Sequence, residues 1–391
     1  KDVFITVRVP NPSVERAEAK VLLETLESIP RSYDAARLAT GEDGAPIFEV
    51  ILPMTASAQD LNRIYYYYRD FVIGKQHQKL HGGDVTIAEW VGESKPDRIN
   101  VIPLFEDWNG MLSSVDIFDE YLKDKELPYL RVFLARSDPA VNYGLVSAVL
   151  LNLVTLSRLA KFSQKRGIPI HPILGVGSAP FRGHAKPGSI EQLLETYPSV
   201  ATFTIQSSFK YDHPVQEVLG ALAQLNAHTP SAPREFDEVR VLDIAKRYTE
   251  QYQRDLEPLI PIVQQISPLI PRRRKRKMHI GLFGYSRQLN GHALPRAIPF
   301  VASLYSVGIP PEILGLSALS RDDISFLKTI YPSIEYDIAA AAPFCDIESP
   351  HFSTETRAAL ERVIPNRTPH EEYLKRSRFV ESRQSGQSIT N

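Results

Sequence analysis

The residues of this chain whose types and spacing could carry chemistry are carboxylates and arginines at the ends of strand-like apolar runs. Glu106 closes the run Asn100–Glu106, and Asp138 directly follows the next run, Tyr129–Ser137. If these runs are neighbouring parallel strands, about 4.8 Å apart, the two carboxylates can converge on one hard cation. The sequence therefore predicts that Glu106 and Asp138 bind Mg²⁺ or Mn²⁺. The alternative is that both are ordinary acids at the rim of a sheet, paired with arginines.

A glycine-containing loop, Gly175–Gly183, follows another strand-like run and could bring backbone N–H groups, such as that of Gly177, close to an anion. Its arginine, Arg182, can bind phosphate or carboxylate through two hydrogen bonds. The loop matches neither the P-loop nor the dinucleotide fingerprint, so a plain strand-to-helix turn remains an alternative. Among the histidines, His184 is the one expected to face a ligand. A clamp for an anionic substrate is predicted from five arginines, some of which could instead form structural ion pairs: Arg8, Arg136, Arg182, Arg287 and Arg296.

Eight strand-like runs alternate with amphipathic segments along the chain. Repeated strand–helix units make a parallel sheet, and a count near eight favours a (β/α)8 barrel of the TIM type over an open doubly wound sheet. We expect one elaborated barrel domain over residues 1–391, with additional helices in the sixth crossover, Ser208–Met278, and in the C-terminal region after Leu319. The predicted strands are Val3–Pro10, Phe48–Thr55, Asn100–Glu106, Tyr129–Ser137, Ile168–Gly177, Thr202–Ser207, His279–Ser286 and Pro311–Leu319. Active sites of such barrels lie at the carboxyl ends of the strands, where the carboxylates and arginines above are found.

Composition excludes several classes of protein. Hydrophobic residues make up 43% of the chain, which is enough for a large core, and the formal charge of -1 gives no global attraction to nucleic acid or membrane. The most apolar stretch, Gly144–Leu156, is shorter than the roughly 20 residues of a membrane span. The basic run Arg272–Lys277 is interpreted as a solvated loop or a subunit contact, not a nucleic-acid patch. Because Cys345 is the single cysteine, a reducing, cytoplasmic setting is expected.

Several of these segments, in this order, resemble those of phosphoenolpyruvate carboxylase, specifically its shorter archaeal type. Pro103-Leu104-Phe105-Glu106 resembles the family's metal-binding strand, and Arg136-Ser137-Asp138 resembles its Tyr-Ser-Asp metal segment. Gly175–Gly183 occupies the place of its glycine-rich loop. Arg296-Ala297-Ile298-Pro299 is similar to its Arg-Ala-Ile-Pro element, Arg287 lies near its Gly-Ser-Arg, and Arg8 falls at its first-strand arginine. The resemblance covers nearly the whole chain and is strongest from about Asn100 to Phe300.

The resemblance implies an enzyme that forms oxaloacetate and phosphate from phosphoenolpyruvate and bicarbonate, through carboxyphosphate and a metal-stabilised enolate. It implies catalytic roles for Arg8 and Arg182, and a cytoplasmic homotetramer that fixes carbon dioxide for the tricarboxylic acid cycle. The chain departs from the longer bacterial and plant form, which has an arginine at Val176 and a lysine at Val141. The family's catalytic histidine motif is not found in the chain, so a preceding N-terminal segment is expected to supply it. Two alternatives remain: another Mg²⁺-dependent phosphoenolpyruvate or pyruvate barrel enzyme, or a non-catalytic anion-binding fragment.

Overall fold

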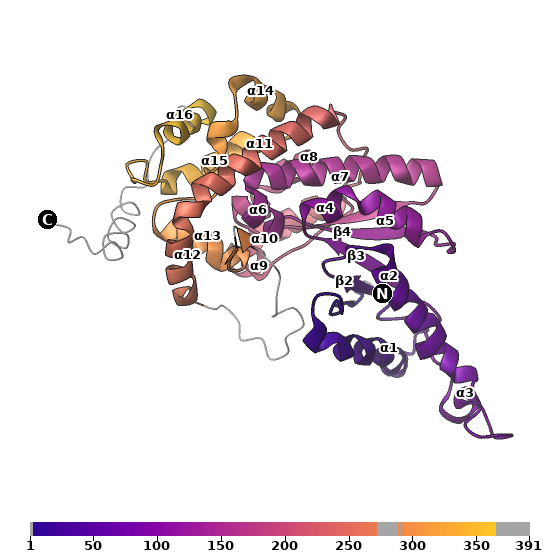
Figure 1. Ribbon diagram of the computed structural model, residues 1–391. Coiled ribbons are helices and arrows are strands. Elements are labelled where there is room, and N and C mark those ends of the chain that lie inside the picture. Colours follow the sequence, from indigo (N-terminus) through magenta and orange to yellow (C-terminus); the bar gives the residue numbers. More distant parts are fainter. Residues whose placement is uncertain (1–2, 272–287, 290, 365–391) are drawn as a thin grey trace. The chain divides into compact units, whose positions relative to one another are not determined.

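A parallel sheet of six strands forms the frame of the fold in the computed structural model, which describes residues 3–271, 288–289 and 291–364 (Figure 1). The strands follow one another in chain order, and the pairs β1–β2, β2–β3, β3–β4 and β5–β6 are parallel. They are β1 (Thr6–Arg8), β2 (Glu49–Leu52), β3 (Asn100–Phe105), β4 (Leu130–Ala135), β5 (Ile170–Gly175) and β6 (Thr202–Phe203). The chain therefore has an α/β fold with a six-stranded half-barrel, and the first six predicted strands are confirmed.

Helices lie in every connection between successive strands of this sheet. The sixth crossover contains α9 to α12 within its described part, and α14 to α16 follow Leu319, so the additional helices predicted in both places are confirmed. The α-helices are α1 (Ala19–Thr40), α2 (Ala58–Tyr66), α3 (Ile87–Val91), α4 (Trp108–Leu112), α5 (Ser114–Tyr121), α6 (Ser137–Tyr143), α7 (Leu145–Arg166), α8 (Ile190–Thr196), α9 (Ser207–Tyr211), α10 (Val215–Ala227), α11 (Glu238–Leu256), α12 (Ile260–Ile266), α13 (Ala297–Ser306), α14 (Arg321–Ile330), α15 (Ile334–Ala341) and α16 (Thr354–Val363). Shorter turns are η1 (Arg16–Glu18), the π-helical η2 (Tyr67–Ile73), η3 (Gly74–His77), η4 (Pro180–Arg182), η5 (Glu257–Leu259), η6 (Ser267–Leu269), η7 (Leu316–Ala318) and η8 (Ala342–Phe344).

The eighth predicted strand, Pro311–Leu319, is wrong. The segment consists of turns followed by η7, with Gly315 at φ +85°. Proline lacks the N–H that a central strand donates, and Pro310 and Pro311 stand together at its start. The run is apolar because its side chains are buried, and burial alone does not distinguish a strand from a packed turn. The seventh predicted strand, His279–Ser286, lies outside the described residues, and a short antiparallel hairpin follows it, β7 (Gln288–Leu289) with β8 (His292–Ala293).

Helix α7 is the one described helix long and apolar enough to cross a membrane. However, 83% of its apolar window is buried inside the structure. The side chain of Asn152, which interrupts this window, is also buried and donates hydrogen bonds to the carbonyls of Ala135 (3.1 Å) and Ala148 (2.7 Å). Packing in the interior therefore accounts for the apolar character of this helix.

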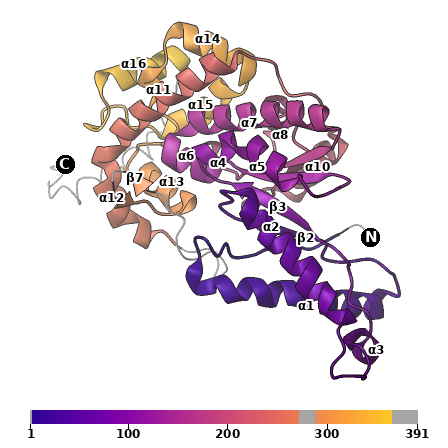
Figure 2. The same cartoon turned by 45° about the vertical axis from the view of Figure 1, so that its right-hand side comes forward.

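The chain divides into two compact units. The first contains the described residues before Ala135 together with Lys161–His171, and the second contains the remaining described residues. In the first unit, α1 contacts η2, which continues from α2, and the Tyr67 hydroxyl of η2 donates to Glu27 of α1 at 2.7 Å (Figure 2). The boundary falls at the end of β4, so Glu106 belongs to the first unit and Asp138 to the second.

In the second unit, two tyrosines of α11 are held between two glycines. Tyr248 and Tyr252 are fully buried, and their hydroxyls donate to the carbonyls of Leu314 (2.8 Å) and Val141 (3.0 Å). A Cβ atom on Gly144 would lie 2.6 Å from the Tyr248 ring, and one on Gly315 would lie 3.0 Å from Tyr252 Cβ. Both glycines also have positive φ, so the close approach and the backbone conformation each require glycine.

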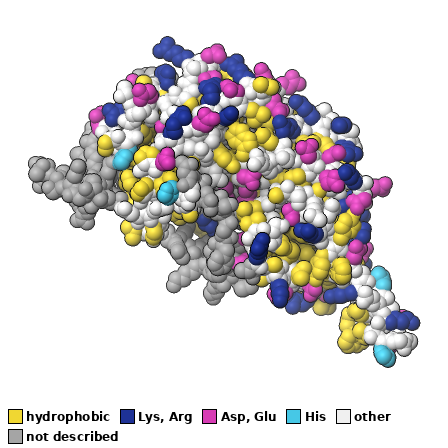
Figure 3. Space-filling view, viewed as in Figure 1, with side chains coloured by type: hydrophobic (Ala, Val, Ile, Leu, Met, Phe, Trp, Pro, Cys, Tyr) yellow, Lys and Arg dark blue, Asp and Glu magenta, His cyan; other side chains and the backbone are white. Residues whose placement is uncertain are grey.

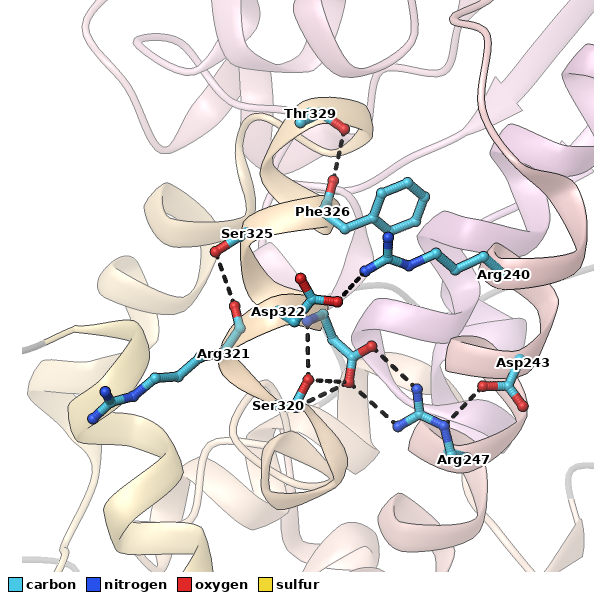
Figure 4. Close-up of polar contacts among 10 residues, drawn as sticks. Arg240, Asp243, Arg247, Ser320, Arg321, Asp322, Ser325, Phe326 and Thr329 are labelled. Carbon is cyan, nitrogen blue, oxygen red and sulfur yellow. Dashed lines mark hydrogen bonds and ion pairs between the residues drawn. The ribbon is translucent and has the colours of Figure 1, made fainter.

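Ion pairs connect α11 to α14 in the same unit, as Figure 4 shows. Arg240 pairs with Asp322 at 2.5 Å, and its guanidinium lies 4.1 Å from the centre of the Phe326 ring. Arg247 pairs with Asp243 at 2.9 Å and with Asp323 at 3.2 Å. Asp323 also completes the capping box that begins α14. On the face drawn in Figure 3, acidic and basic side chains are interspersed rather than gathered by sign.

Candidate active site

In the first unit, the predicted residues Arg8 and Glu106 lie together at the carboxyl ends of β1 and β3. Glu106 directly follows β3, and its Oε2 lies 3.9 Å from the Arg8 guanidinium. The same oxygen accepts a hydrogen bond from the backbone N–H of Met54 at 2.9 Å. Met54 has φ +49°, an uncommon conformation for a residue other than glycine, and such strain is often found at functional sites. The buried Asn11 side chain donates to the carbonyls of Pro53 (2.8 Å) and Met54 (3.1 Å), which stabilises this turn.

In the second unit, Arg182 is the central residue of the site. Its Nε donates to Ser137 Oγ at 3.3 Å, and its Nη1 donates to Gln206 Oε1 at 3.0 Å. Ser137 begins α6, with one residue between it and β4, and Gln206 follows β6, so residues after two strands fix one guanidinium. Burial lowers the pKa of Arg182 from its ordinary value, while the nearby Asp138 carboxylate opposes that shift. A partly buried arginine beside a carboxylate can bind an anionic ligand without a large solvent shell to displace.

The glycine loop is closed by its own backbone. The N–H of Gly177 donates to the Arg182 carbonyl at 2.8 Å, and the N–H of Ala185 donates to the Gly177 carbonyl at 2.9 Å. The Arg182 guanidinium lies across Gly177 so closely that a Cβ atom there would be 2.9 Å from Arg182 Cζ. Gly177 is therefore needed for the position of the arginine, a role that the anion-binding prediction did not include.

Arg136 lies beneath this loop rather than on its exposed side. It is 1% exposed, and its Nη1 donates to the Phe181 carbonyl at 3.3 Å. Burial leaves Arg136 no exposed face in this conformation, so the structure shows it supporting the loop. Gly183, at φ +106°, approaches the Arg136 side chain so closely that a Cβ atom would lie 3.3 Å from Arg136 Cγ.

His184 does not face a ligand site as expected. It is 3% exposed, and its Nδ1 lies 2.6 Å from Asp337 Oδ1. Its ring stacks on that of Tyr336, with centroids 4.9 Å apart.

The remaining predicted arginines are placed less fully. Arg296 is half-buried and precedes the first residue of α13, which packs against α6, the helix that carries Asp138. Arg287 lies outside the described residues, as do Tyr285 and Ser286.

Sequence reasoning missed the buried acid Glu312, which bonds the glycine loop. It is fully buried, and its Oε1 accepts hydrogen bonds from the Phe181 N–H (2.9 Å) and the Tyr305 hydroxyl (3.1 Å). Burial raises the pKa of Glu312 to about 7, although these hydrogen bonds oppose the shift. The available signal was one acid inside the apolar segment Pro311–Leu319, which had been read as a strand.

No cluster of three or more His, Cys, Asp or Glu side chains suited to a metal occurs among the described residues. The predicted site needs only two protein carboxylates, because magnesium usually keeps several water ligands. Glu106 and Asp138 supply hard oxygen donors, and both follow strands of the sheet. The chemistry of this donor set fits Mg²⁺ or Mn²⁺.

An α/β fold with carboxylates and arginines at its strand ends is the arrangement expected of an enzyme that acts on an anionic substrate. Comparison with known proteins makes this class specific. A family profile described as phosphoenolpyruvate carboxylase matches residues 1–383. The chain belongs to the phosphoenolpyruvate carboxylase family, whose enzymes are carboxy-lyases, and the predicted family and enzyme class are confirmed.

Three relatives, each named phosphoenolpyruvate carboxylase, illustrate the similarity. The protein of Methanothermobacter thermautotrophicus is 50% identical over 364 residues, which cover 93% of this chain and 75% of the relative. That of Methanospirillum hungatei is 48% identical over 376 residues, covering 95% and 77%. That of Pyrococcus abyssi is 48% identical over 364 residues, covering 93% and 75%.

Proposed function

We propose that the residues described above carry out the reaction of this family, in which phosphoenolpyruvate and bicarbonate give oxaloacetate and phosphate. The observation that carries the assignment of residues is the position of Arg182, which is fixed by Ser137 and Gln206 beside Asp138. A guanidinium fixed at strand ends is suited to bind the phosphoryl group, because its fork of donors matches phosphate oxygens.

The remaining arginines complete the substrate site in this proposal. Arg8, Arg287 and Arg296 neutralise the carboxylate and phosphoryl charges of the substrate. Arg136 contributes by supporting the glycine loop from beneath, since its guanidinium bonds the Phe181 carbonyl. The backbone N–H of Gly177 already donates to the backbone carbonyl of Arg182. In this conformation Gly177 therefore serves the site chiefly by leaving room for the Arg182 guanidinium.

Glu106 and Asp138 would hold Mg²⁺ or Mn²⁺. When bound, the cation would supply positive charge that stabilises the negative charge developing on substrate oxygens. The Met54 N–H donates to Glu106 Oε2 and the Arg8 guanidinium lies 3.9 Å from the same oxygen, which orients this carboxylate.

The proposed reaction has two steps. A bicarbonate oxygen attacks phosphorus and the bond from phosphorus to the enol oxygen breaks, which leaves carboxyphosphate and the enolate of pyruvate. Carboxyphosphate then releases phosphate and carbon dioxide, and the enolate carbon forms a bond to that carbon dioxide. Water must be excluded, because a proton on the enolate carbon would give pyruvate instead. We propose that the segment Gly175–Gly188, which contains the glycine loop, closes over the substrate site and excludes water.

Three further features follow only from the family resemblance and stand as proposals. They are closure of the half-barrel into a full (β/α)8 barrel, assembly as a homotetramer, and a cytoplasmic role in supplying the tricarboxylic acid cycle.

The first experiment measures oxaloacetate formation by the purified protein from phosphoenolpyruvate and Mg²⁺, with and without added bicarbonate. Formation that depends on bicarbonate is the expected result. Conversion of phosphoenolpyruvate to pyruvate at the same rate with and without bicarbonate would refute the proposal and favour another enzyme that uses phosphoenolpyruvate.

A further inference from the structure

We propose that Arg136, His184 and Asp337 form a buried positioning network, joined by one bound water molecule, that fixes the loop bearing Arg182 for phosphate binding. The inference rests on the proposed role of Arg182. The proposal adds three residues that act by positioning Arg182, and one binding site for a water molecule that joins them.

The hydrogen bonds of Asp337 determine the protonation pattern of His184. Asp337 Oδ1 lies 2.6 Å from His184 Nδ1, and Oδ2 accepts from the hydroxyls of Tyr331 (2.5 Å) and Ser333 (3.2 Å). Because an ionised carboxylate can only accept hydrogen bonds, the proton of its bond to His184 lies on Nδ1. In the neutral ring, His184 Nε2 is then an acceptor.

His184 lines a small cavity in the second unit. The cavity has a volume of about 10 Å³, and its lining includes Arg136, His184, Gln192, Tyr197 and Asp337. This volume matches the roughly 10–15 Å³ that one water molecule needs when volume is measured in this way.

Three buried atoms of the lining residues have no hydrogen-bond partner among the described residues: Arg136 Nε, His184 Nε2 and Gln192 Oε1. The Tyr197 hydroxyl, which lies in the same lining, already bonds the Arg136 guanidinium. Arg136 Nε is a donor, and His184 Nε2 and Gln192 Oε1 are acceptors. Burial raises the pKa of Tyr197, while the Arg136 guanidinium opposes that shift, so the hydroxyl keeps its proton and can donate. Two donors and two acceptors are the complement of one water molecule.

The network contacts the loop on both sides of Arg182. On one side, Arg136 Nη1 donates to the Phe181 carbonyl. On the other, His184 follows Gly183 and has φ +56°, a conformation that its bond to Asp337 helps to maintain. Arg136 is also the residue before Ser137, which accepts from the Arg182 guanidinium. Loosening the network should therefore displace Arg182 without removing any group that touches the substrate.

The test measures the binding of phosphoenolpyruvate by calorimetry in the presence of Mg²⁺ and without bicarbonate, together with steady-state kinetics. For Asp337→Asn we expect the Kd and the KM for phosphoenolpyruvate to rise about tenfold, because small displacements of a binding group have effects of this size. The KM for bicarbonate should change less than twofold. The matched control is Ser147→Ala, which removes a buried hydroxyl that donates to Ala245, away from the loop, and should lower Tm without changing Kd.

A second variant covers the case in which Asp337→Asn does not fold. His184→Asn tolerates the positive φ and keeps a donor for Asp337, but is too short to reach the water. It should raise Kd in the same direction by a smaller factor. If both variants bind phosphoenolpyruvate as the wild type does, the network is only structural and the inference is wrong.

The closing experiment separates this inference from the proposed function. A wild-type protein that binds phosphoenolpyruvate but forms no oxaloacetate would refute the function, and the weaker binding of the variants would still support the network. A crystal structure of the wild type is expected to show one water bonded to His184 Nε2. Direct contact of His184 Nε2 with the other side chains there, with no water between them, would overturn the proposed water site.

Discussion

The two groups of site residues are held in different ways. In the first unit, Glu106 accepts a hydrogen bond from the Met54 backbone N–H and lies 3.9 Å from the guanidinium of Arg8, whose side chain is 34% exposed. In the second unit, Arg182 is held by two side-chain hydrogen bonds, by the loop backbone and by close contact with Gly177. Long, partly exposed ion pairs contribute little to stability, whereas several hydrogen bonds to one side chain fix its geometry. We infer that Glu106 acts mainly through its charge and Arg182 mainly through its position.

Removal of the charge at Glu106 tests the first half of this comparison and should have the largest effect. Glu106→Gln keeps an acceptor for the Met54 N–H but loses the negative charge that would hold the cation. We expect kcat/KM to fall about a thousandfold, equivalent to several kcal/mol of transition-state stabilisation, with Tm nearly unchanged. Steady-state assays over a range of Mg²⁺ concentrations check this. Full activity with the wild-type Mg²⁺ dependence would show that Glu106 binds no metal. The control is Glu126→Gln, a change at an exposed residue, which should leave activity unchanged.

Displacement of Arg182 without changing its chemistry tests the second half. Gly177→Ala adds a Cβ atom 2.9 Å from Arg182 Cζ. Because the Arg182 side chain is flexible, its guanidinium can move away from this Cβ atom without a change in the backbone. We expect kcat/KM for phosphoenolpyruvate to fall about a hundredfold while the protein remains folded. Gly220→Ala on α10, where a Cβ atom meets nothing within 4 Å, should leave activity unchanged. An unchanged KM for phosphoenolpyruvate in Gly177→Ala would contradict a positional role for Arg182.

The pH dependence of stability should reveal the buried acid that binds the loop. The pKa of Glu312 in the folded protein, about 7, lies above its ordinary value of 4.5, so the folded state binds the proton more tightly than the unfolded chain. Its contribution to stability is therefore complete below about pH 4.5 and is lost as the pH rises through 7. Glu312→Gln removes this dependence, so relative to wild type it should gain roughly 3 kcal/mol between pH 4.5 and pH 8.

Urea unfolding across this pH range measures the effect. An exposed change on α10, Glu217→Gln, should leave the pH dependence as in wild type. If Glu312→Gln and wild type show parallel curves, the pKa of Glu312 is the same in the folded protein as in the unfolded chain, and burial does not raise it.

The smallest effect is expected at the ion pairs between α11 and α14, which hold helices and not the site (Figure 4). Arg247→Met breaks its pairs with Asp243 and Asp323, and because the arginine is 40% exposed the loss of stability should be about 1 kcal/mol. The KM for phosphoenolpyruvate should not change. A rise in that KM would show that general loosening of the second unit displaces Arg182, and would weaken the case for a specific network.

The sequence predicted which polar residues follow the strands. Apolar runs identify β3 and β4, and the polar residues after each run can be read directly, so the placement of Glu106 and Asp138 after strands needed no tertiary information. Asp337 and Glu312 could not be found in this way, because they approach the loop from 153 and 131 residues along the chain from His184 and Phe181. Arg136 shows the same limit, since its position at a strand end predicts its element but not that its side chain turns inward.

The eighth strand failed for a related reason. Apolar residues in Pro311–Leu319 signal burial, and the conformation of the segment is decided by two prolines and by contacts that Gly315 makes with α11. The pattern of apolar residues therefore predicts the strands of the sheet and the residues that follow them. Contacts between distant segments determine the conformation of Pro311–Leu319 and the inward position of Arg136.

The two tyrosines packed between Gly144 and Gly315 have a consequence for how this sequence can vary. A larger residue at either glycine meets the same pair of rings, so the two positions are not independent even though they lie far apart in the chain. Shortening Tyr252 would relieve crowding at both, at the loss of its hydrogen bond to Val141. We therefore expect Gly144, Tyr248, Tyr252 and Gly315 to change together or not at all among descendants of this protein, as a single inherited unit.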